Sequence, residues 1–483
     1  MNVPRVPEPN RASAGESDPL LSEEEAHVWD QQLIAKYDVA GPRYTSYPTA
    51  PQFDDSYNSD VYKQEALKHL QQSIAPLSLY VHVPFCQNIC YYCACNKIVT
   101  SDHSVARKYL DYLAKEIQLQ SELIGGRRTV MQLHFGGGTP TFLDGAELTE
   151  LMHQLASHYT LTDCERREYS IELDPRTVAR DDVALLKGLG FNRISIGVQD
   201  FDEQVQQAVN RCQDFGMIKS LTETARLYQF KSISYDLIYG LPLQTLASLA
   251  ATLDKTVELS PDRIAFYNYA HLPERFKSQR AIDRLDLPAA DEKITMLTLI
   301  ANKLIAAGYH YIGMDHFVKP EDDLAVAQHD GMLQRNFQGY STCLAPDLIG
   351  LGVSSISSLQ GSYAQNERNL DDYYRRLDAG VLPVAKGIKL DDDDHIRRAV
   401  ITQIICNLLL DTEAIERQFK IVFSDYFSQE LLALKVMEND GLLHWHSAKM
   451  LITEQGRVML RNICMSFDKY LQQKSIGSFS KAL

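Results

Sequence analysis

The stretch "LSLYVHVPFCQNICYYCAC" (residues 77–95) joins an apolar segment directly to a loop that holds four cysteines. These are Cys86, Cys90, Cys93 and Cys95. The first seven residues have the length and the β-branched content of a buried strand. In parallel α/β folds, the reactive side chains gather on the loops that follow the carboxyl ends of the strands. The junction therefore predicts a parallel α/β fold in which the cysteines lie on a loop at the carboxyl ends of the strands, where reactive side chains gather.

Five further segments repeat this strand-like character, and the stretches between them show helical spacing of apolar residues. In the first such stretch, Tyr109, Leu110, Leu113 and Ile117 recur at three- and four-residue intervals. Alternating strands and helices predict a parallel sheet with right-handed crossovers. Six units fit a partial (β/α)6 barrel, similar to part of a TIM barrel, better than a closed eightfold one. The further segments are "VMQLHF" (130–135), "YSIEL" (169–173), "NRISIGV" (192–198), "SISYDLIY" (232–239) and "DRIAFYNY" (262–269).

The predicted fold class is α/β, with an N-terminal arm before the partial barrel and a mostly helical C-terminal domain after it. Residues 1–35 are rich in Pro, Ser and acidic residues and are expected to form a mobile tail. The arm contains "AGPRYTSYPTAPQF" (40–53), which predicts an ordered, extended segment. The other predicted ranges are 36–76 for the arm, 77–270 for the barrel, 271–386 for a helix-rich extension with loops that lines the substrate pocket, and 387–483 for the C-terminal domain.

The formal net charge of −15 argues against nucleic acid or an anionic membrane surface as the main partner. No apolar run approaches the length that crosses a bilayer, and the N-terminal residues lack the basic start and apolar stretch of a secretory signal. We therefore expect a cytoplasmic monomer with no nucleic-acid or membrane partner. In a reducing cytosol, clustered cysteines indicate metal binding or catalysis rather than disulfides.

The spacing of Cys86, Cys90 and Cys93 is C-x3-C-x2-C. Three thiolates on one short loop can ligate three irons of a [4Fe–4S] cluster, which leaves the fourth iron open to an outside ligand. Structural zinc requires four closed ligands, and Cys95 could complete such a set. Buried, unligated cysteines fit poorly with the Asn and Tyr content of the loop. The spacing favours the iron–sulfur cluster, and zinc is the open alternative.

The same spacing after the first barrel strand is the signature of radical S-adenosylmethionine (SAM) enzymes, which this chain resembles. The longer string "YVHVPFCQNICYYCACNKIVT" (80–100), together with "GPRYTSYPTA" (41–50), is similar to the oxygen-independent coproporphyrinogen III oxidase family, also called coproporphyrinogen dehydrogenases. The resemblance covers nearly the whole chain after about residue 35. Further motifs that carry it are "HFGGGTPTFL", "IELDPR", "GFNRISIGVQDF", "DLIYGLP", "YAHLPERF", "GMDHF", "NFQGY" and "RNICM".

The resemblance implies that a [4Fe–4S] cluster on Cys86, Cys90 and Cys93 binds one SAM molecule, and that a second SAM lies beside the first. The glycines of "HFGGGTP" (134–140) would let a ligand approach the backbone. By motif match, the contacts to the cluster-bound SAM are Tyr80, Gly137, Glu172 and Ile356. The contacts to the second SAM are Tyr92, Gly138, Thr139, Gln199, Arg211, Asp236 and Ala270.

Several of these residues also have a plain structural interpretation. Glu172 could form a buried salt bridge, and Gln199 and Asp236 could cap the helices that follow them. Arg211 would ordinarily be a solvated helix residue, although its guanidinium could clamp a carboxylate. On their own, Ile356 and Ala270 have the character of core residues.

The resemblance marks Cys95 and Tyr80 as catalytic candidates. Cys95 matches the fourth cysteine of the family motif, which is not a cluster ligand. A thiol at that position either donates a hydrogen atom beside the radical site or fills space.

By resemblance, the substrate is coproporphyrinogen III, two of whose propionates become vinyl groups to give protoporphyrinogen IX. A 5′-deoxyadenosyl radical derived from SAM would abstract a β-hydrogen from each propionate, and loss of CO2 and one electron would follow. The usual type of electron donor is a reduced flavodoxin or ferredoxin. Arg43 and the tyrosines of the arm could close over this anionic macrocycle, or the arm could simply pack on the barrel.

The main alternative is a haem chaperone related to the same enzymes. Such relatives share the barrel and the cysteine triplet, but they generally lack the "GPRYTSYPT" arm and the fourth cysteine, both of which are present here. A non-catalytic zinc module and a radical SAM enzyme that acts on haem itself are further alternatives.

Overall fold

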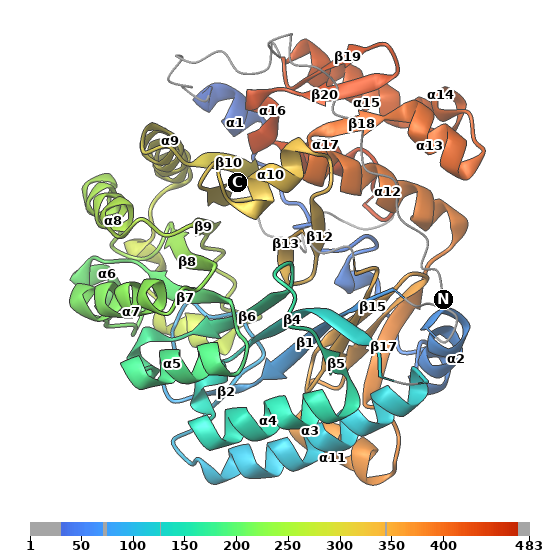
Figure 1. Cartoon of the computed structure of the whole chain (residues 1–483). Coiled ribbons are helices and arrows are strands. Elements are labelled where there is room, and N and C mark those ends of the chain that lie inside the picture. Colours follow the sequence, from blue (N-terminus) through green and yellow to red (C-terminus); the bar gives the residue numbers. More distant parts are fainter. Residues whose placement is uncertain (1–29, 71–74, 126, 343–344, 472–483) are drawn as a thin grey trace.

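The computed structural model of the chain describes residues 30–70, 75–125, 127–342 and 345–471 (Figure 1). Its main sheet contains six adjacent parallel strands in the order β9-β8-β7-β6-β4-β1. They coincide with the six predicted strands to within one or two residues at each end, so the partial barrel is confirmed. The bounds are β1 Leu77–Val83, β4 Thr129–Gly137, β6 Glu168–Leu173, β7 Arg193–Gln199, β8 Ser232–Tyr239 and β9 Arg263–Asn268.

Helices alternate with these strands and cover the outer face of the sheet (Figure 1). The apolar stripe predicted on the first of them is buried, since Tyr109, Leu113 and Ile117 of α3 are fully inaccessible to solvent. Burial of such a stripe against a sheet is the main source of stability for an amphipathic helix. The helices are α3 Ser104–Leu123, α4 Gly145–His158, α5 Arg180–Gly188, α6 Glu203–Ala208, α7 Phe215–Leu227, α8 Leu246–Leu259 and α9 Ala290–Ala306.

Residues 271–386 contain the expected helices and loops, but the sequence analysis missed the strands of this region, which extend the sheet at both ends. Beyond β9 lie the antiparallel strands β11 and β10, and on the other side of β1 lies the parallel β14, followed by β15, β16 and β17. β14 is buried on both faces, so it shows no alternation, and β15 and β16 are rich in Ser and poor in β-branched residues. The bounds are β10 His310–Gly313, β11 His316–Val318, α10 Asp323–His329, β14 Asp347–Leu351, β15 Ile356–Leu359, β16 Ser362–Asn366, α11 Leu370–Asp378 and β17 Val384–Lys389.

The N-terminal arm lies against this antiparallel part of the sheet. It holds helix α2 (Ser59–Leu70), and Asp54 forms an isolated bridge with Gly387 of β17. Of the predicted tail, residues 1–29 lie outside the described part of the chain. Residues 31–35 belong to helix α1 (Gln31–Tyr37), in which Ile34 is buried, so this end of the predicted tail is ordered.

The C-terminal region is mostly helical with a small three-stranded sheet, as predicted, and it forms the upper part of the molecule in Figure 1. None of the helices in the described residues has the length and apolar content to cross a membrane. The main sheet continues across residue 270, and the residue ranges assigned to the domains stay predictions. The C-terminal bounds are α12 Asp392–Asn407, β18 Leu409–Asp411, α13 Thr412–Phe419, α14 Phe423–Tyr426, α15 Ser428–Asn439, β19 Leu443–His446, β20 Lys449–Ile452, α16 Glu454–Val458 and α17 Leu460–Met465.

Short elements complete the loops around the barrel. A two-stranded hairpin of β12 and β13 rises beside the barrel mouth. The bounds are η1 Ala50–Gln52, β2 Phe85–Cys86, β3 Ile98–Val99, η2 Pro140–Phe142, β5 Thr160–Leu161, η3 Pro175–Thr177, η4 Lys277–Ala281, η5 Arg284–Asp286, β12 Gln334–Asn336 and β13 Gly339–Ser341.

Candidate active site

The cysteine loop leaves β1 and is closed by the short parallel pairing of β2 with β3. Cys86, Cys90 and Cys93 line one cavity of about 160 Å³, which we call the cluster-side cavity. Within the described part of the chain, no three His, Cys, Asp or Glu side chains converge closely enough to hold a single metal ion. Zinc needs all its ligands within ~2.0–2.3 Å of one ion, whereas thiolates that bind separate irons of a cluster stand further apart. Three thiols of one loop thus face one cavity, as ligation of three irons of one cluster requires.

Two guanidinium groups, those of Arg176 and Arg211, lie beside the Cys90 sulfur. Arg176 Nη2 lies 3.8 Å and Arg211 Nη1 lies 3.7 Å from Cys90 Sγ. Asp174 Oδ2 accepts from both side chains, at 2.7 Å from Arg176 and 2.9 Å from Arg211. Since Arg211 is only 7% exposed, the interpretation of it as a solvated helix residue is wrong. N–H donors beside a cluster thiolate stabilise its negative charge.

The three glycines that end β4 bring the backbone against the cysteine loop. Gly137 has φ +112°, and a Cβ there would lie 2.4 Å from the His82 ring. A Cβ on Gly138 would lie 2.7 Å from the backbone of Pro84. Only glycine permits this approach, which leaves a polar backbone edge beside the cluster-side cavity. A cradle of this kind, together with three thiols on one loop, fits an iron–sulfur cluster and a small polar cofactor.

Glu172, at the end of β6, is fixed beside this cradle. Its carboxylate accepts from His134 Nε2 at 3.1 Å and from the Gly137 N–H at 3.1 Å. Burial raises the pKa of Glu172, but these hydrogen bonds outweigh it, so the pKa lies below its ordinary value. Glu172 is therefore an ionised hydrogen-bond acceptor with oxygen atoms that face the cavities.

Cys95 stands where three cavities meet. It lines the cluster-side cavity, a large cavity of about 780 Å³ and a side cavity of about 380 Å³. A hydrogen bond between the Cys93 and Cys95 thiols lowers the pKa of Cys93 to about 6 and raises that of Cys95 well above its ordinary value. Cys93 is thus suited to bind iron as a thiolate, whereas Cys95 keeps its hydrogen as a thiol.

The two groups of predicted SAM contacts line two adjoining cavities and overlap at Gly137 and Glu172, which line both. The four residues assigned to the cluster-bound SAM all line the side cavity, and six of the seven assigned to the second SAM line the cluster-side cavity. Ala270 is separate, because it lines the large cavity. The first group is Tyr80, Gly137, Glu172 and Ile356; the second is Tyr92, Gly138, Thr139, Gln199, Arg211 and Asp236.

The ends of β7 and β8 aim polar side chains inward rather than at helix ends. Gln199 has φ +65° at an irregularity in the pairing of β7 with β8, and it lines the cavity. Asp236 lies inside β8, accepts from Ser195 Oγ at 2.7 Å, and has its pKa raised to about 6 by burial. Helix α6 is capped by Asp202 instead. Helix capping is therefore not the role of Gln199 or Asp236.

Tyr80 reaches the same region from the middle of β1. Its ring stacks on His134 with centroids 5.8 Å apart, and its hydroxyl lies 3.1 Å from His82 Nδ1. Thr139, on the glycine turn, lies with its Oγ1 3.4 Å from Cys86 Sγ. Both side chains are thus held beside the cysteine loop by contacts within the chain.

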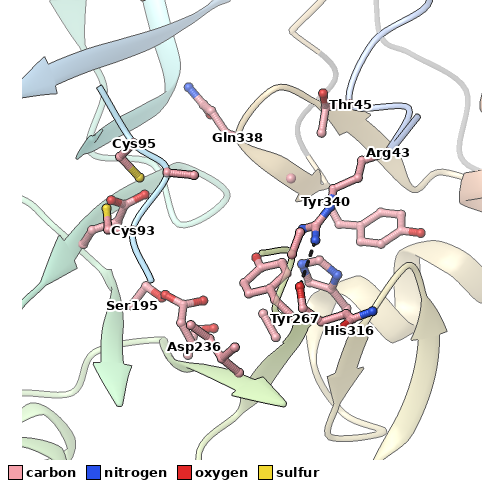
Figure 2. Close-up of a pocket in the computed structure, with 18 of the residues that line it drawn as sticks. Arg43, Thr45, Cys93, Cys95, Ser195, Asp236, Tyr267, His316, Gln338 and Tyr340 are labelled. Carbon is pink, nitrogen blue, oxygen red and sulfur yellow. Dashed lines mark hydrogen bonds between the residues drawn. The ribbon is translucent and has the colours of Figure 1, made fainter. Parts of the chain in front are cut away.

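The large cavity extends from the cysteine loop to the N-terminal arm (Figure 2). At the far end Arg43 points inward, with its guanidinium 5.7 Å from the Tyr267 ring and 3.3 Å from the Asn268 carbonyl oxygen. Burial and the charge of Arg335 lower the pKa of His316 to about 4, so this ring is neutral. The volume is in the range of cavities that enclose drug-sized ligands.

The structure adds residues to this cavity that the sequence did not single out. His134 lines it beside Glu172. Ser195 and Gln338 line it on the side of the cysteine loop, and Tyr267 and His316 line it opposite (Figure 2). Each lies within a strand or motif quoted above. A motif does not tell which of its side chains faces the cavity, and this is why they were missed.

Comparison with known proteins gives relatives over nearly the full chain. The profile of the radical SAM superfamily matches residues 80–256, and that of the HemN C-terminal domain matches residues 390–459. The oxygen-independent coproporphyrinogen III oxidase of Pseudomonas aeruginosa is 49% identical over 94% of this chain and 99% of its own length. The enzyme of that name from Escherichia coli is 46% identical over 94% of this chain and 98% of its own length. The solved structure of coproporphyrinogen III oxidase (HemN) from E. coli, a radical SAM enzyme, aligns with a TM-score of 0.86 at 45% identity, covering 92% of this chain and 99% of the other.

With this barrel and cysteine loop, the chain is a radical SAM enzyme. Such enzymes use a [4Fe–4S] cluster and SAM, which fit the thiols and the glycine cradle described above. Identity over almost the whole length of several relatives narrows the class further. The chain belongs to the family of oxygen-independent coproporphyrinogen III oxidases.

Proposed function

We propose that this chain converts coproporphyrinogen III to protoporphyrinogen IX without dioxygen, by oxidative decarboxylation of two propionate side chains to vinyl groups. The observation that carries this proposal is the large cavity, which joins Cys95 at the cysteine loop to Arg43 at the arm. The end at the cysteine loop lies at the reactive edge of the barrel, and the end at the arm has a guanidinium that can bind a carboxylate. Relatives that share up to 49% of the sequence bear the name of this enzyme.

Three cysteines and the glycine turn would hold the cofactors. When bound, the reduced cluster and SAM supply a 5′-deoxyadenosyl radical, which is strong enough to take hydrogen from an unactivated carbon. Cys86, Cys90 and Cys93 would hold the [4Fe–4S] cluster. The backbone of Gly137 and the ionised carboxylate of Glu172 would bind the polar groups of SAM.

A second SAM molecule is part of the proposal. All four predicted contacts to the first SAM line the side cavity and six of the seven to the second line the adjoining cluster-side cavity, with Gly137 and Glu172 on both, and this distribution supports two neighbouring sites. Arg211 retains an Nε–H that is buried without an acceptor in the described structure, and this donor would serve a ligand carboxylate.

The chain orients the substrate and excludes water while each propionate loses one hydrogen atom, one CO2 and one electron. Arg43 would anchor a carboxylate at the arm, so that another propionate reaches the cysteine loop. Cys95, at the junction of the cavities, would either donate a hydrogen atom or shape this junction, and Tyr80 would hold the histidines beside it. We further propose a cytoplasmic monomer that receives electrons from a reduced flavodoxin or ferredoxin.

The test is anaerobic reconstitution with iron and sulfide, followed by addition of SAM, a reductant, coproporphyrinogen III and cell extract as a source of the electron acceptor. After oxidation of the products, we expect protoporphyrin together with 5′-deoxyadenosine. A protein that cleaves SAM but yields no protoporphyrin would contradict the proposed substrate, and haem would be tested next. The haem chaperone alternative gains no support from the relatives, which are named as oxidases.

The role of the arm is tested by Arg43→Ala. Because this change removes one carboxylate anchor, we expect a higher KM for coproporphyrinogen III with unchanged iron content. Unchanged kinetics would show that the arm only packs on the barrel.

A further inference from the structure

A small cavity of about 80 Å³ lies on the other side of the arm from the large cavity. Tyr44 and Thr45 of the arm line both cavities, so one turn of chain separates them. The rest of its lining comes from the β12–β13 hairpin, from β15 and β16, and from α12. No residue of the cysteine loop takes part in this lining, so the small cavity lies away from the proposed radical chemistry.

The Arg335 guanidinium borders this cavity, and two of its nitrogen atoms lack an acceptor among the described residues. Its Nε and Nη1 atoms are buried and have no hydrogen-bond partner in the described part of the chain. Its contact is a cation–π interaction with Tyr340, at 4.5 Å from the ring centroid. A buried cation without a counter-charge is costly, because its N–H groups have given up water without replacement.

The rest of the lining also suits an anion. Arg398 supplies a second guanidinium, which is held by the Gln360 carbonyl oxygen at 2.8 Å. Hydroxyl groups of Thr45, Ser46, Ser358 and Thr402 surround the space, and none of the described lining residues is an Asp or a Glu. On the Tyr340 side, His316 is neutral and offers no negative charge to Arg335.

We propose that the small cavity is a carboxylate pocket, in which Arg335 and Arg398 hold a propionate of the substrate that does not react. This inference rests on the proposed function. The size agrees, since one water molecule needs only about 10–15 Å³ of such space, and about 80 Å³ admits a carboxylate with its short stem. The macrocycle would lie in the large cavity and extend one side chain past Thr45.

A propionate that does not react is present in both substrate and product. A pocket for such a propionate should therefore contribute to the binding of both. Coproporphyrin III and protoporphyrin IX are stable, oxidised probes that retain those propionates. Coproporphyrin III tetramethyl ester has the same ring without a free carboxylate. Their dissociation constants can be measured by fluorescence titration of the reconstituted enzyme, independently of turnover.

We expect Arg335→Met to weaken binding of coproporphyrin III and of protoporphyrin IX by a similar factor, about 10- to 100-fold, the range for losing hydrogen bonds to a charged group. Binding of the ester should be unchanged. Arg398→Met should act in the same direction with a smaller factor. Arg457→Met is the matched control, because Arg457 Nε is also buried without an acceptor but lines none of the cavities described above.

Three outcomes would overturn the inference: wild-type affinity for all probes in Arg335→Met, equal weakening for the ester, or weakening for coproporphyrin III alone. If Arg335→Met fails to fold or to bind iron, Arg335→Lys keeps the charge without the planar fork and must show the same pattern with a smaller loss. Turnover by the wild-type enzyme is measured in parallel. Its absence would contradict the proposed function, whereas normal turnover with unaffected binding in the variants would contradict the pocket alone.

Discussion

The cluster-side cavity and the small cavity beyond the arm differ in how their arginines are paired. Beside the cysteine loop, Arg176 and Arg211 share the carboxylate of Asp174 and face the Cys90 sulfur. Beyond the arm, Arg335 has buried N–H groups with no acceptor among the described residues. A paired cation is held in place before any ligand arrives, whereas an unpaired one gains stability only when an anion binds. We infer that the cluster-side cavity is preorganised and that the small cavity is completed by the substrate.

The two cavities also differ in the segments that build them. The cluster-side cavity is built around the carboxyl ends of β1, β4, β6, β7 and β8, which are neighbours in a parallel sheet. The small cavity joins the arm to the β12–β13 hairpin and α12, both of which lie far from the arm in the sequence. Changes at the cluster-side cavity should therefore impair the chemistry or cofactor binding, and changes elsewhere should alter substrate affinity or stability.

The largest effect is expected from Cys86→Ala. Loss of one of three thiolate ligands removes the cluster and with it all measurable SAM cleavage. Iron content, the absorption of the cluster and formation of 5′-deoxyadenosine measure this. Cys164→Ala, outside the loop, should retain all three, and a full cluster in Cys86→Ala would contradict the proposed ligand set.

Glu172→Gln should lower the affinity for SAM by about 10- to 100-fold, because a charged acceptor becomes neutral. The His134 and Gly137 donors would then face an amide. Equilibrium binding of SAM to the reconstituted protein measures the loss, and the exposed Glu165→Gln is the control. Wild-type affinity would mean that the carboxylate serves only to position His134.

Arg176→Gln should shift the midpoint potential of the cluster to more negative values, because it removes a positive donor from the Cys90 sulfur. The fall in turnover should be smaller than for Glu172→Gln. A potentiometric titration followed by electron paramagnetic resonance measures the shift, with the exposed Arg166→Gln as the control. An unchanged potential would show that this guanidinium does not influence the electronic properties of the cluster.

The smallest effect on activity is expected from Glu116→Gln. In the wild type, the Glu116 side chain joins the two parts of the sheet. Glu116 of α3 accepts from Gly352 after β14 and from Asn366 of β16. Burial raises its pKa to about 7. Between its unfolded pKa near 4.5 and this folded value, only the unfolded chain ionises, so stability falls as pH rises, by about 3 kcal/mol in total.

Because Gln does not ionise, the Glu116→Gln variant should not show this fall in stability as the pH rises. Denaturant unfolding at pH 5 and at pH 7.5 measures it, with the exposed Glu122→Gln of the same helix as the control. An identical pH dependence in Glu116→Gln and the wild type would contradict a raised pKa for Glu116.

Prediction from sequence succeeded where a feature is local. The six parallel strands, the amphipathic α3 and the helical C-terminal region follow from periodicity and composition. It failed for β14 to β16, because a strand buried on both faces has no period and a Ser-rich hairpin has weak strand propensity. Among the site residues, the motifs indicated Glu172 and Asp236, but the contacts of His134 and Ser195 with them appear only across neighbouring strands.

By itself, the sequence determined the class of chemistry, because the spacing of Cys86, Cys90 and Cys93 is set by covalent geometry within one loop. It also determined the glycine turn at Gly137 and Gly138, since no other residue permits such an approach of backbone to backbone. Only the tertiary structure decided that Arg335 has buried N–H groups without an acceptor in the described part of the chain, and that Cys95 stands where three cavities meet. The physical reason is that burial and charge pairing depend on segments far apart in the chain, whose contacts no local pattern encodes.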